Sequence, residues 1–74
     1  MGNKKDHMVQ VIMGGFRYRA VEANNVIHFS RDGDPIGNAR WHDDQFIHCS
    51  AVLPDDVTGA LEKLVKARMD VNWE

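Results

Sequence analysis

The chain has 74 residues, of which 43% are hydrophobic and 27% charged, and a formal net charge of −2 at pH 7. This length allows one small domain, and the composition is that of an ordinary globular chain rather than a disordered one. The weak negative charge excludes a protein that holds nucleic acid by overall charge alone. No run approaches the roughly 20 apolar residues that a membrane-spanning helix needs.

The cysteine count and the N-terminal residues predict where the protein works and where its domain begins. Cys49 is the only cysteine, so no internal disulfide can form, and a reducing, cytoplasmic location is expected. The first residues, MGNKKDH, contain no apolar stretch that could act as a signal peptide. We expect residues 1–7 to be a disordered extension or a cloning remnant, and residues 8–74 to form a single small α+β domain.

Two stretches with a strand-like period of two flank a pair of glycines. VQVIM from Val9 and FRYRAVE from Phe16 alternate, and Gly14–Gly15 between them predicts a tight hairpin turn. If Met13 faces Phe16, one face of the hairpin is apolar throughout. That face consists of Val9, Val11, Met13, Phe16, Tyr18 and Ala20.

A third strand follows Asn24 and Asn25, which favour a turn because asparagine tolerates a positive φ angle. A turn there places Phe29 opposite Ala20 and adds Ile27 and Phe29 to the apolar face. The opposite face is then mixed and partly basic. We expect it to carry Gln10, Ile12, Arg17, Arg19, Val21, Val26, His28 and Ser30.

The next part of the chain predicts a fourth, irregular strand and a fifth one. Asp32–Gly33 is a turn dipeptide, and a strand over about residues 36–41 follows it. One register points Ile36 at the core and leaves Trp41 on the mixed face, whereas a one-residue slip or bulge reverses both. We take the first register. His42–Gln45 is then a turn, and QFIHCSAVL from Gln45 is the final strand.

From Pro54 the apolar period becomes helical. Val57, Leu61 and Val65 recur with charged residues between them, and the helix is expected to end within residues 69–71. Gly59 inside it suggests a close approach to the sheet. The sequence therefore predicts a four- or five-stranded antiparallel meander with one C-terminal helix packed on its apolar face.

The stretch WHDDQFIHCS concentrates residue types that bind metals or act in catalysis. Zinc sites need about four converging ligands, but His48 and Cys49 point to opposite faces of a strand. Asp43 and Asp44 fit a turn, and Cys49 is expected to be a buried, small apolar side chain. No nucleophile elbow, P-loop or metalloprotease motif occurs. We expect no enzymatic activity, no catalytic or metal-binding residues, no cofactor and no small-molecule substrate. A metal-dependent activity that uses His42, His48 and Cys49 is the third hypothesis, after protein binding and nucleic-acid binding.

The mixed face provides the candidate binding residues. Strand alternation puts the aromatic residues of FRYRAVE on the core side and its arginines on the other side. The expected partner-binding residues are Arg17, Arg19, His28, Arg40 and Trp41. The alternative is a solvated sheet face on which Arg17 pairs with Asp32.

The mixed face, with exposed aliphatic residues beside arginine and tryptophan, is typical of a protein interface. We therefore expect a regulatory protein that binds another protein or a second copy of itself, without a membrane partner. The alternative is a nucleic-acid-binding regulator that uses the same basic residues. In size and layout the predicted domain is similar to small accessory and inhibitor proteins of phages.

Overall fold

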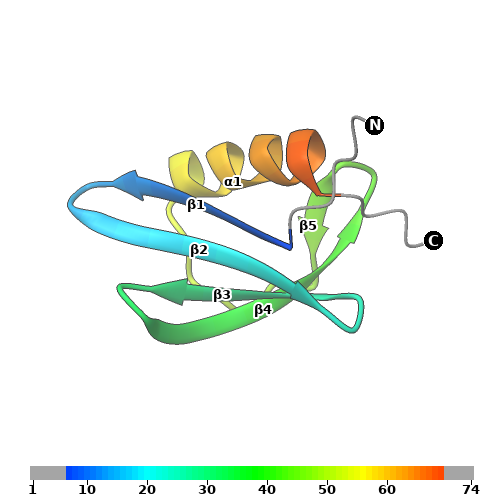
Figure 1. The fold of residues 1–74 in the computed structure, drawn as a ribbon, viewed down its shortest axis with the longest axis horizontal. Coiled ribbons are helices and arrows are strands. Elements are labelled where there is room, and N and C mark those ends of the chain that lie inside the picture. Colours follow the sequence, from blue (N-terminus) through cyan, green and yellow to red (C-terminus); the bar gives the residue numbers. More distant parts are fainter. Residues whose placement is uncertain (1–6, 70–74) are drawn as a thin grey trace.

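The computed structural model describes residues 7–69, which form five strands and one helix (Figure 1). The strands pair in chain order, each antiparallel to the next. The predicted α+β class and the meander are therefore confirmed, with five strands. They are β1 (Met8–Met13), β2 (Phe16–Ala23), β3 (Val26–Arg31), β4 (Asp34–His42) and β5 (Gln45–Ile47), followed by α1 (Asp55–Arg68).

Four two-residue turns join the strands, and both residues of each turn have a positive φ angle. The turns are Gly14–Gly15, Asn24–Asn25, Asp32–Gly33 and Asp43–Asp44, with φ angles from 52° to 90°. Turns of this kind match the right-handed twist of the strands that they join. Glycine adopts such angles without strain, and asparagine and aspartate tolerate them better than other residues. All four turns predicted from the sequence are confirmed.

The register of the first three strands is also confirmed. Met13 pairs with Phe16 across the first turn, and Ala20 pairs with Phe29 across the second. Ala20 and Phe29 are buried as expected. Phe16 is on the expected side but is 41% exposed, because it lies at the end of its strand; the Arg31 guanidinium lies 5.0 Å from its ring centroid.

One buried cluster joins the sheet to the helix. Val57, Leu61 and Val65 lie four residues apart along α1, so they share one face of the helix, and all three are buried. The cluster consists of Val9, Tyr18, Ala20, Ile27, Phe29, Ala39, Trp41, Val57, Leu61, Val65 and Met69. No helix within residues 7–69 has both the length and the apolar character that crossing a membrane requires.

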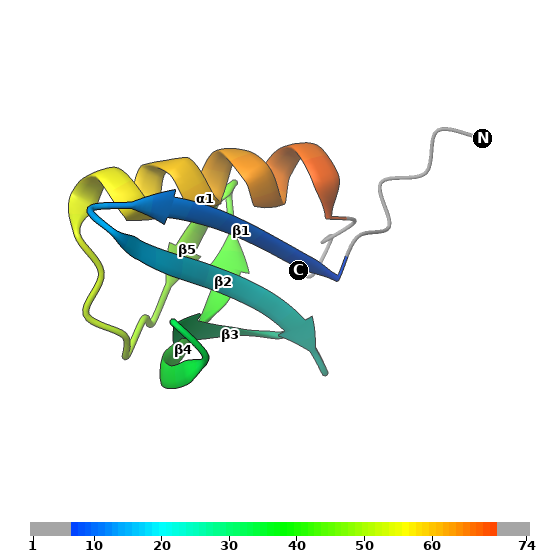
Figure 2. The same cartoon turned by 60° about the vertical axis from the view of Figure 1, so that its left-hand side comes forward.

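The helix contacts both the first and the last strand of a curled sheet. It runs alongside β1 in both ribbon views (Figures 1 and 2). The backbone N–H of Phe46 in β5 donates a hydrogen bond to the Glu62 carboxylate at 2.9 Å. Lys66 and Asp44 form an ion pair at 3.2 Å. The expected close approach at Gly59 is wrong, because an added Cβ there would meet no atom within 4 Å.

A β-bulge in β4 overturns the expected position of Trp41. His28 pairs with Asn38 and Phe29 with Gly37, but Ser30 pairs with Pro35, so the register shifts by one residue. Gly37 has a φ angle of 147°, and its backbone packs closely against Ala51. The shift lets Ile36 pack against the core while Trp41, further along the strand, also faces the core with 6% of its surface exposed. The expectation that Trp41 lies on the mixed face is therefore wrong.

The last strand is shorter than expected. β5 ends at Ile47, and His48, with a φ angle of 51°, turns the chain away from the sheet. The chain then returns to β4, where the Ser50 backbone N–H donates to the Asn38 carbonyl at 2.8 Å. Cys49 is exposed, so its expected role as a buried apolar side chain is wrong.

The N-terminal side of the fold includes His7, which we had expected to lie outside it. The Glu22 backbone N–H donates to the His7 carbonyl at 2.8 Å, and His7 Nδ1 lies 3.0 Å from a Glu22 carboxylate oxygen. Residues 1–6 of the expected extension lie outside the described residues.

Candidate functional site

The outward side of β1–β4 carries most of the expected binding residues, and we call it the open face. It is the side of the sheet that points away from the buried cluster. Strand alternation and the observed register assign to it Met8, Gln10, Ile12, Arg17, Arg19, Val21, Ala23, Val26, His28, Ser30, Pro35, Asn38, Arg40 and His42. Of the expected binding residues, the structure places four on this face: Arg17, Arg19, His28 and Arg40, with Arg17 and Arg40 toward opposite ends of it. Trp41 is absent because the bulge turns it inward.

The arginines of the open face have no acidic partner within residues 7–69. The ion pairs in this part of the chain are His7 with Glu22 and Lys66 with Asp44. Arg19 donates instead from Nε to the Gln10 side-chain oxygen, at 3.0 Å. A neutral acceptor orients the guanidinium without cancelling its charge.

The expected pairing of Arg17 with Asp32 takes a different form. The Asp32 carboxylate accepts a hydrogen bond from the backbone N–H of Arg17 at 3.0 Å, and the Asp32 N–H donates to the Arg17 carbonyl at 2.8 Å. These contacts tie the β3–β4 turn to β2. They use the main chain of Arg17, and they leave its side chain exposed.

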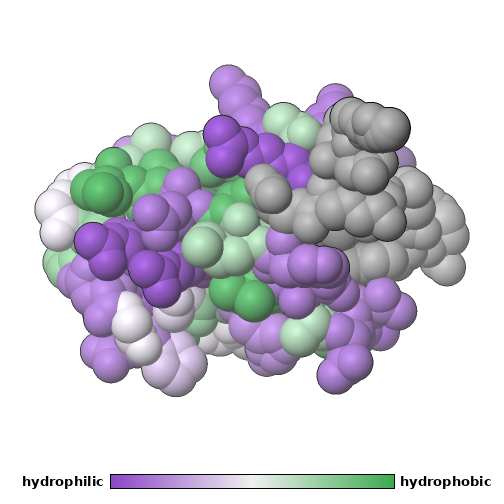
Figure 3. Space-filling model, viewed as in Figure 1, coloured by the Kyte–Doolittle hydropathy of each residue, from purple (hydrophilic) through white to green (hydrophobic). Residues whose placement is uncertain are grey.

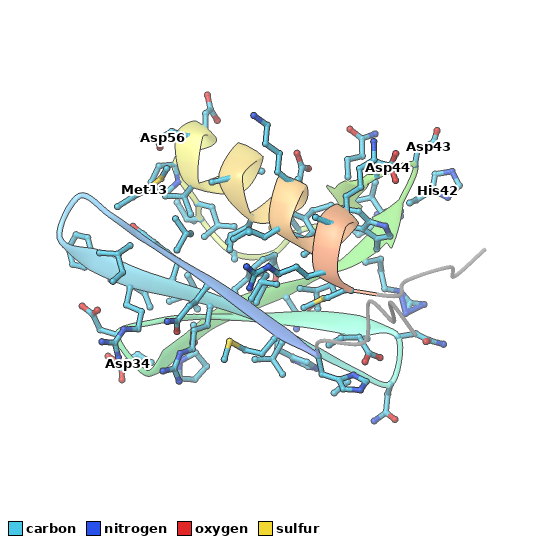
Figure 4. The ribbon with its side chains drawn as sticks, turned by 45° about the horizontal axis from the view of Figure 1, so that its top comes forward. Met13, Asp34, His42, Asp43, Asp44 and Asp56 are labelled. Carbon is cyan, nitrogen blue, oxygen red and sulfur yellow. The ribbon has the colours of Figure 1, made fainter. Side chains whose placement is uncertain are left out.

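Acidic residues lie at the edge of the open face rather than at its outward positions: the Asp32 carboxylate is 3.0 Å from the Arg17 backbone nitrogen. None of the outward positions that define the open face is occupied by aspartate or glutamate. Asp43, Asp44 and Asp56 lie around the two ends of α1, whereas Asp34 lies across the sheet from α1, near the β3–β4 turn (Figure 4). The outward strand positions of the open face therefore carry positive charge, with Asp32 and Asp34 at their border, although the whole chain has a net charge of −2.

Exposed aliphatic side chains accompany these cations. Ile12 is 66% exposed, Met8 is 42% exposed and Val21 is 36% exposed. Val21 pairs with Met8 on one side and with His28 on the other. On the side of the molecule seen in Figure 3, hydrophobic and hydrophilic side chains alternate over short distances.

The stretch WHDDQFIHCS contributes to a pocket at one end of the sheet, which we call the histidine pocket. It has a volume of about 560 Å³. It is lined by Asn24, Asn25, Arg40, Trp41, His42, Ile47 and His48. Asp43 and Asp44 form the adjacent turn, and the Cys49 thiol instead lies 3.4 Å from the Ala51 carbonyl oxygen. Within residues 7–69, no three His, Cys, Asp or Glu side chains are grouped in a way that could hold a metal ion.

Sequence reasoning missed this pocket for identifiable reasons. The predicted long final strand would have placed His48 within the sheet, whereas its positive φ angle ends β5 there. The contribution of Asn24 and Asn25 could have been found, since pairing of β3 with β4 carries their turn toward Arg40. Comparisons with protein families, curated proteins and solved structures find no match to the chain.

Proposed function

We propose that this protein is a non-enzymatic interaction module that binds a protein partner through the open face. The observation that carries the proposal is the exposure of Ile12, Met8 and Val21 beside arginines that form no ion pair with an acidic side chain of residues 7–69. Exposed aliphatic groups next to arginine are typical of protein interfaces, in which arginine often contributes a large share of the binding energy. In this proposal α1 packs on the core side of the sheet, and the partner binds to the open face on the opposite side.

Charge favours a partner with an acidic surface. Arg17, Arg19 and Arg40 supply three fixed positive charges, and no carboxylate occupies an outward position among them. Opposite charges steer association and fix the orientation of two proteins, whereas like charges exclude wrong partners. The partner proposed here therefore has acidic residues around a small apolar patch.

The biological role that fits such a module is regulatory. A small accessory or inhibitor protein in the cytoplasm, of the kind that phages encode, would act by covering a surface of a larger protein. Binding of a second copy through the same face is the other form that the interaction can take. Like charges would then face each other across the dimer, which makes a different, acidic partner the better fit.

Nucleic-acid binding is the second candidate, and the absence of carboxylates from the open face favours it. Backbone phosphates are bound by arginine without sequence preference, with strong dependence on salt. The aromatic side chains that would stack on bases are not on this face, however: Tyr18 is buried, and Phe16 lies on the core side. The exposed aliphatic residues also have no role in phosphate binding, so the protein partner is preferred.

The test is affinity capture from lysate of the source cells, with and without nuclease, using three forms of the full chain. They are the wild type, R17A/R19A and K63A/R68A. Both double variants lose two positive charges at exposed or half-exposed positions, but Lys63 and Arg68 lie on α1. We expect one protein to be captured despite nuclease by the wild type and by K63A/R68A, and to be lost with R17A/R19A.

Other outcomes would contradict the proposal. Capture that disappears with nuclease would support nucleic-acid binding instead. Equal loss with both double variants would show that the total charge, rather than the open face, governs binding. Sedimentation of the purified chain detects self-association, and a dimer that R17A/R19A dissociates would identify a second copy as the occupant of the open face.

A further inference from the structure

The histidine pocket carries a different chemistry from the open face. Among the residues that line it, Arg40, His42 and His48 carry or can accept a positive charge, and the amides of Asn24 and Asn25 can donate hydrogen bonds. No aspartate or glutamate lines the pocket. A site with this set of donors and no carboxylate favours an oxyanion.

The number of donors favours phosphate over carboxylate. A carboxylate has two oxygens, whereas a phosphate monoester presents three terminal oxygens that accept strong hydrogen bonds. The guanidinium of Arg40 alone can donate two parallel bonds to such a group. The imidazole and amide groups on the other walls can donate hydrogen bonds to the third oxygen of the phosphate. A carboxylate has no third oxygen, so these donors would remain without an acceptor.

The size of the pocket adds a second constraint. A volume of about 560 Å³ lies within the range of pockets that bind small organic ligands, roughly 300–1,000 Å³. It is therefore larger than an inorganic phosphate ion needs. Ile47 supplies an apolar wall beside the polar groups, which suits the organic part of a ligand.

Local backbone geometry explains why these side chains converge. Asn24, Asn25 and His48 all have φ angles between 51° and 63°, in the left-handed region. Asparagine and histidine are among the residues that enter this region most readily. The β2–β3 turn and the end of β5 thus bring their polar residues toward Arg40 and His42 on β4.

We propose that the histidine pocket binds the phosphate group of a small phosphate monoester, with the guanidinium of Arg40 and the imidazoles of His42 and His48 as its contacts. The proposal does not depend on the identity of the protein partner. It adds a small-molecule site that the sequence did not predict. Because Arg40 belongs both to the pocket and to the open face, a bound phosphate would lie at the border of the proposed interface.

The test is a nuclear magnetic resonance titration of the full, ¹⁵N-labelled chain with adenosine monophosphate. Saturable shifts are expected for amide signals of residues 24–25, 40–42 and 47–48. Inorganic phosphate is expected to compete, and adenosine alone is expected to cause no such shifts. Shifts of equal size and affinity with adenosine, or no saturation with adenosine monophosphate, would overturn the proposal.

Matched variants separate the pocket from general charge attraction. Arg40→Gln is expected to weaken binding by about tenfold, an effect of the size of one lost charge-assisted contact. Arg17→Gln removes the same charge from the open face outside the pocket, and it is expected to leave the affinity unchanged. Equal weakening by both would overturn the proposal. His48→Asn, which keeps a residue tolerant of positive φ, gives a second variant and is also expected to weaken binding.

A phosphoserine peptide distinguishes the source of the phosphate. We expect it to bind more weakly than adenosine monophosphate, because a peptide has to place its flanking residues outside a pocket of about 560 Å³. Tighter binding of the peptide would overturn the assignment to a small molecule. Since neither titration uses the protein partner, failure of this site and failure of the interaction proposed for the open face can be told apart.

Discussion

The first three strands and the last two differ in how strictly they follow the period of two. In β1–β3 every side chain lies on the side of the sheet that simple alternation predicts, and the register is unbroken from Met8 to Arg31. In β4 a bulge at Ile36 and Gly37 interrupts the alternation, and β5 ends after three residues at a positive φ angle. The regular part carries most of the open face, whereas the irregular part forms most of the histidine pocket. Regular pairing thus produces an extended surface, and its interruption produces a concave one.

Replacement of Trp41 is expected to have the largest effect on stability, and it tests the inward position that the bulge gives to this residue. Because the bulge buries Trp41 in the core, Trp41→Ala is expected to lower the free energy of unfolding by about 3–5 kcal/mol. Chemical denaturation followed by circular dichroism measures the loss. The matched control is Ile12→Ala on the regular part, where the side chain is 66% exposed and the expected change is within about 0.5 kcal/mol. Similar losses for the two variants would contradict the inward position of Trp41.

The bulge itself is tested at Gly37. An added Cβ there would lie 2.6 Å from backbone atoms of Ala51, at a φ angle of 147°. Gly37→Ala is therefore expected to cost about 2 kcal/mol, since both the clash and the backbone angle are unfavourable. Gly59→Ala in α1 is the control, with open space around the new Cβ and a gain of up to about 1 kcal/mol. Thermal unfolding of both variants shows whether each substitution raises or lowers the stability. Stabilisation by Gly37→Ala would show that the bulge is not as described.

The contact between β5 and α1 is tested at Glu62. Its carboxylate accepts the backbone N–H of Phe46, which is partly buried. Removing the acceptor with Glu62→Ala is expected to cost about 1–2 kcal/mol and to speed hydrogen exchange at the Phe46 amide. The exchange rates of the β2 amides are expected to rise only by the amount that the loss of global stability accounts for. An unchanged exchange rate at Phe46 would show that the helix does not protect this strand edge.

The smallest expected effect concerns the turn between β2 and β3. Asn25 has a φ angle of 63°, which glycine adopts with less strain. Asn25→Gly creates an Asn–Gly turn and is expected to raise the free energy of unfolding by about 0.5–1 kcal/mol. Asn38→Gly, on a strand, is the control and is expected to lower it. Thermal unfolding detects both changes, and a loss of stability in Asn25→Gly would contradict the turn geometry.

Turn chemistry and the strand period predicted most of the fold. Gly14–Gly15 and Asn24–Asn25 fixed the first two registers, because the turn length and the apolar face agreed. The same logic failed at Trp41, since alternation cannot locate a bulge that depends on a long-range approach of Ala51 to Gly37. It also failed at His48, a non-glycine residue whose positive φ angle no local pattern indicated.

The sequence also predicted part of the candidate site: four of the five expected binding residues lie on the open face. Arg17, Arg19 and His28 lie on the open face because β2 and β3 follow the predicted alternation, whereas Arg40 lies there because the bulge shifts β4 by one residue. Trp41 was assigned to this face by a register that the structure does not have. The histidine pocket could not be predicted, since it depends on where β5 ends.

The most direct test of the account is the affinity of the captured partner for Ile12→Ala compared with Val52→Ala. Both replacements shorten an exposed aliphatic side chain, but Ile12 lies on the open face and Val52, 90% exposed, lies outside the strands. If the open face is the interface, Ile12→Ala raises the dissociation constant by about tenfold, a loss of about 1.4 kcal/mol, and Val52→Ala leaves it unchanged. Unchanged affinity in Ile12→Ala, or an equal loss in both variants, would contradict binding through the open face.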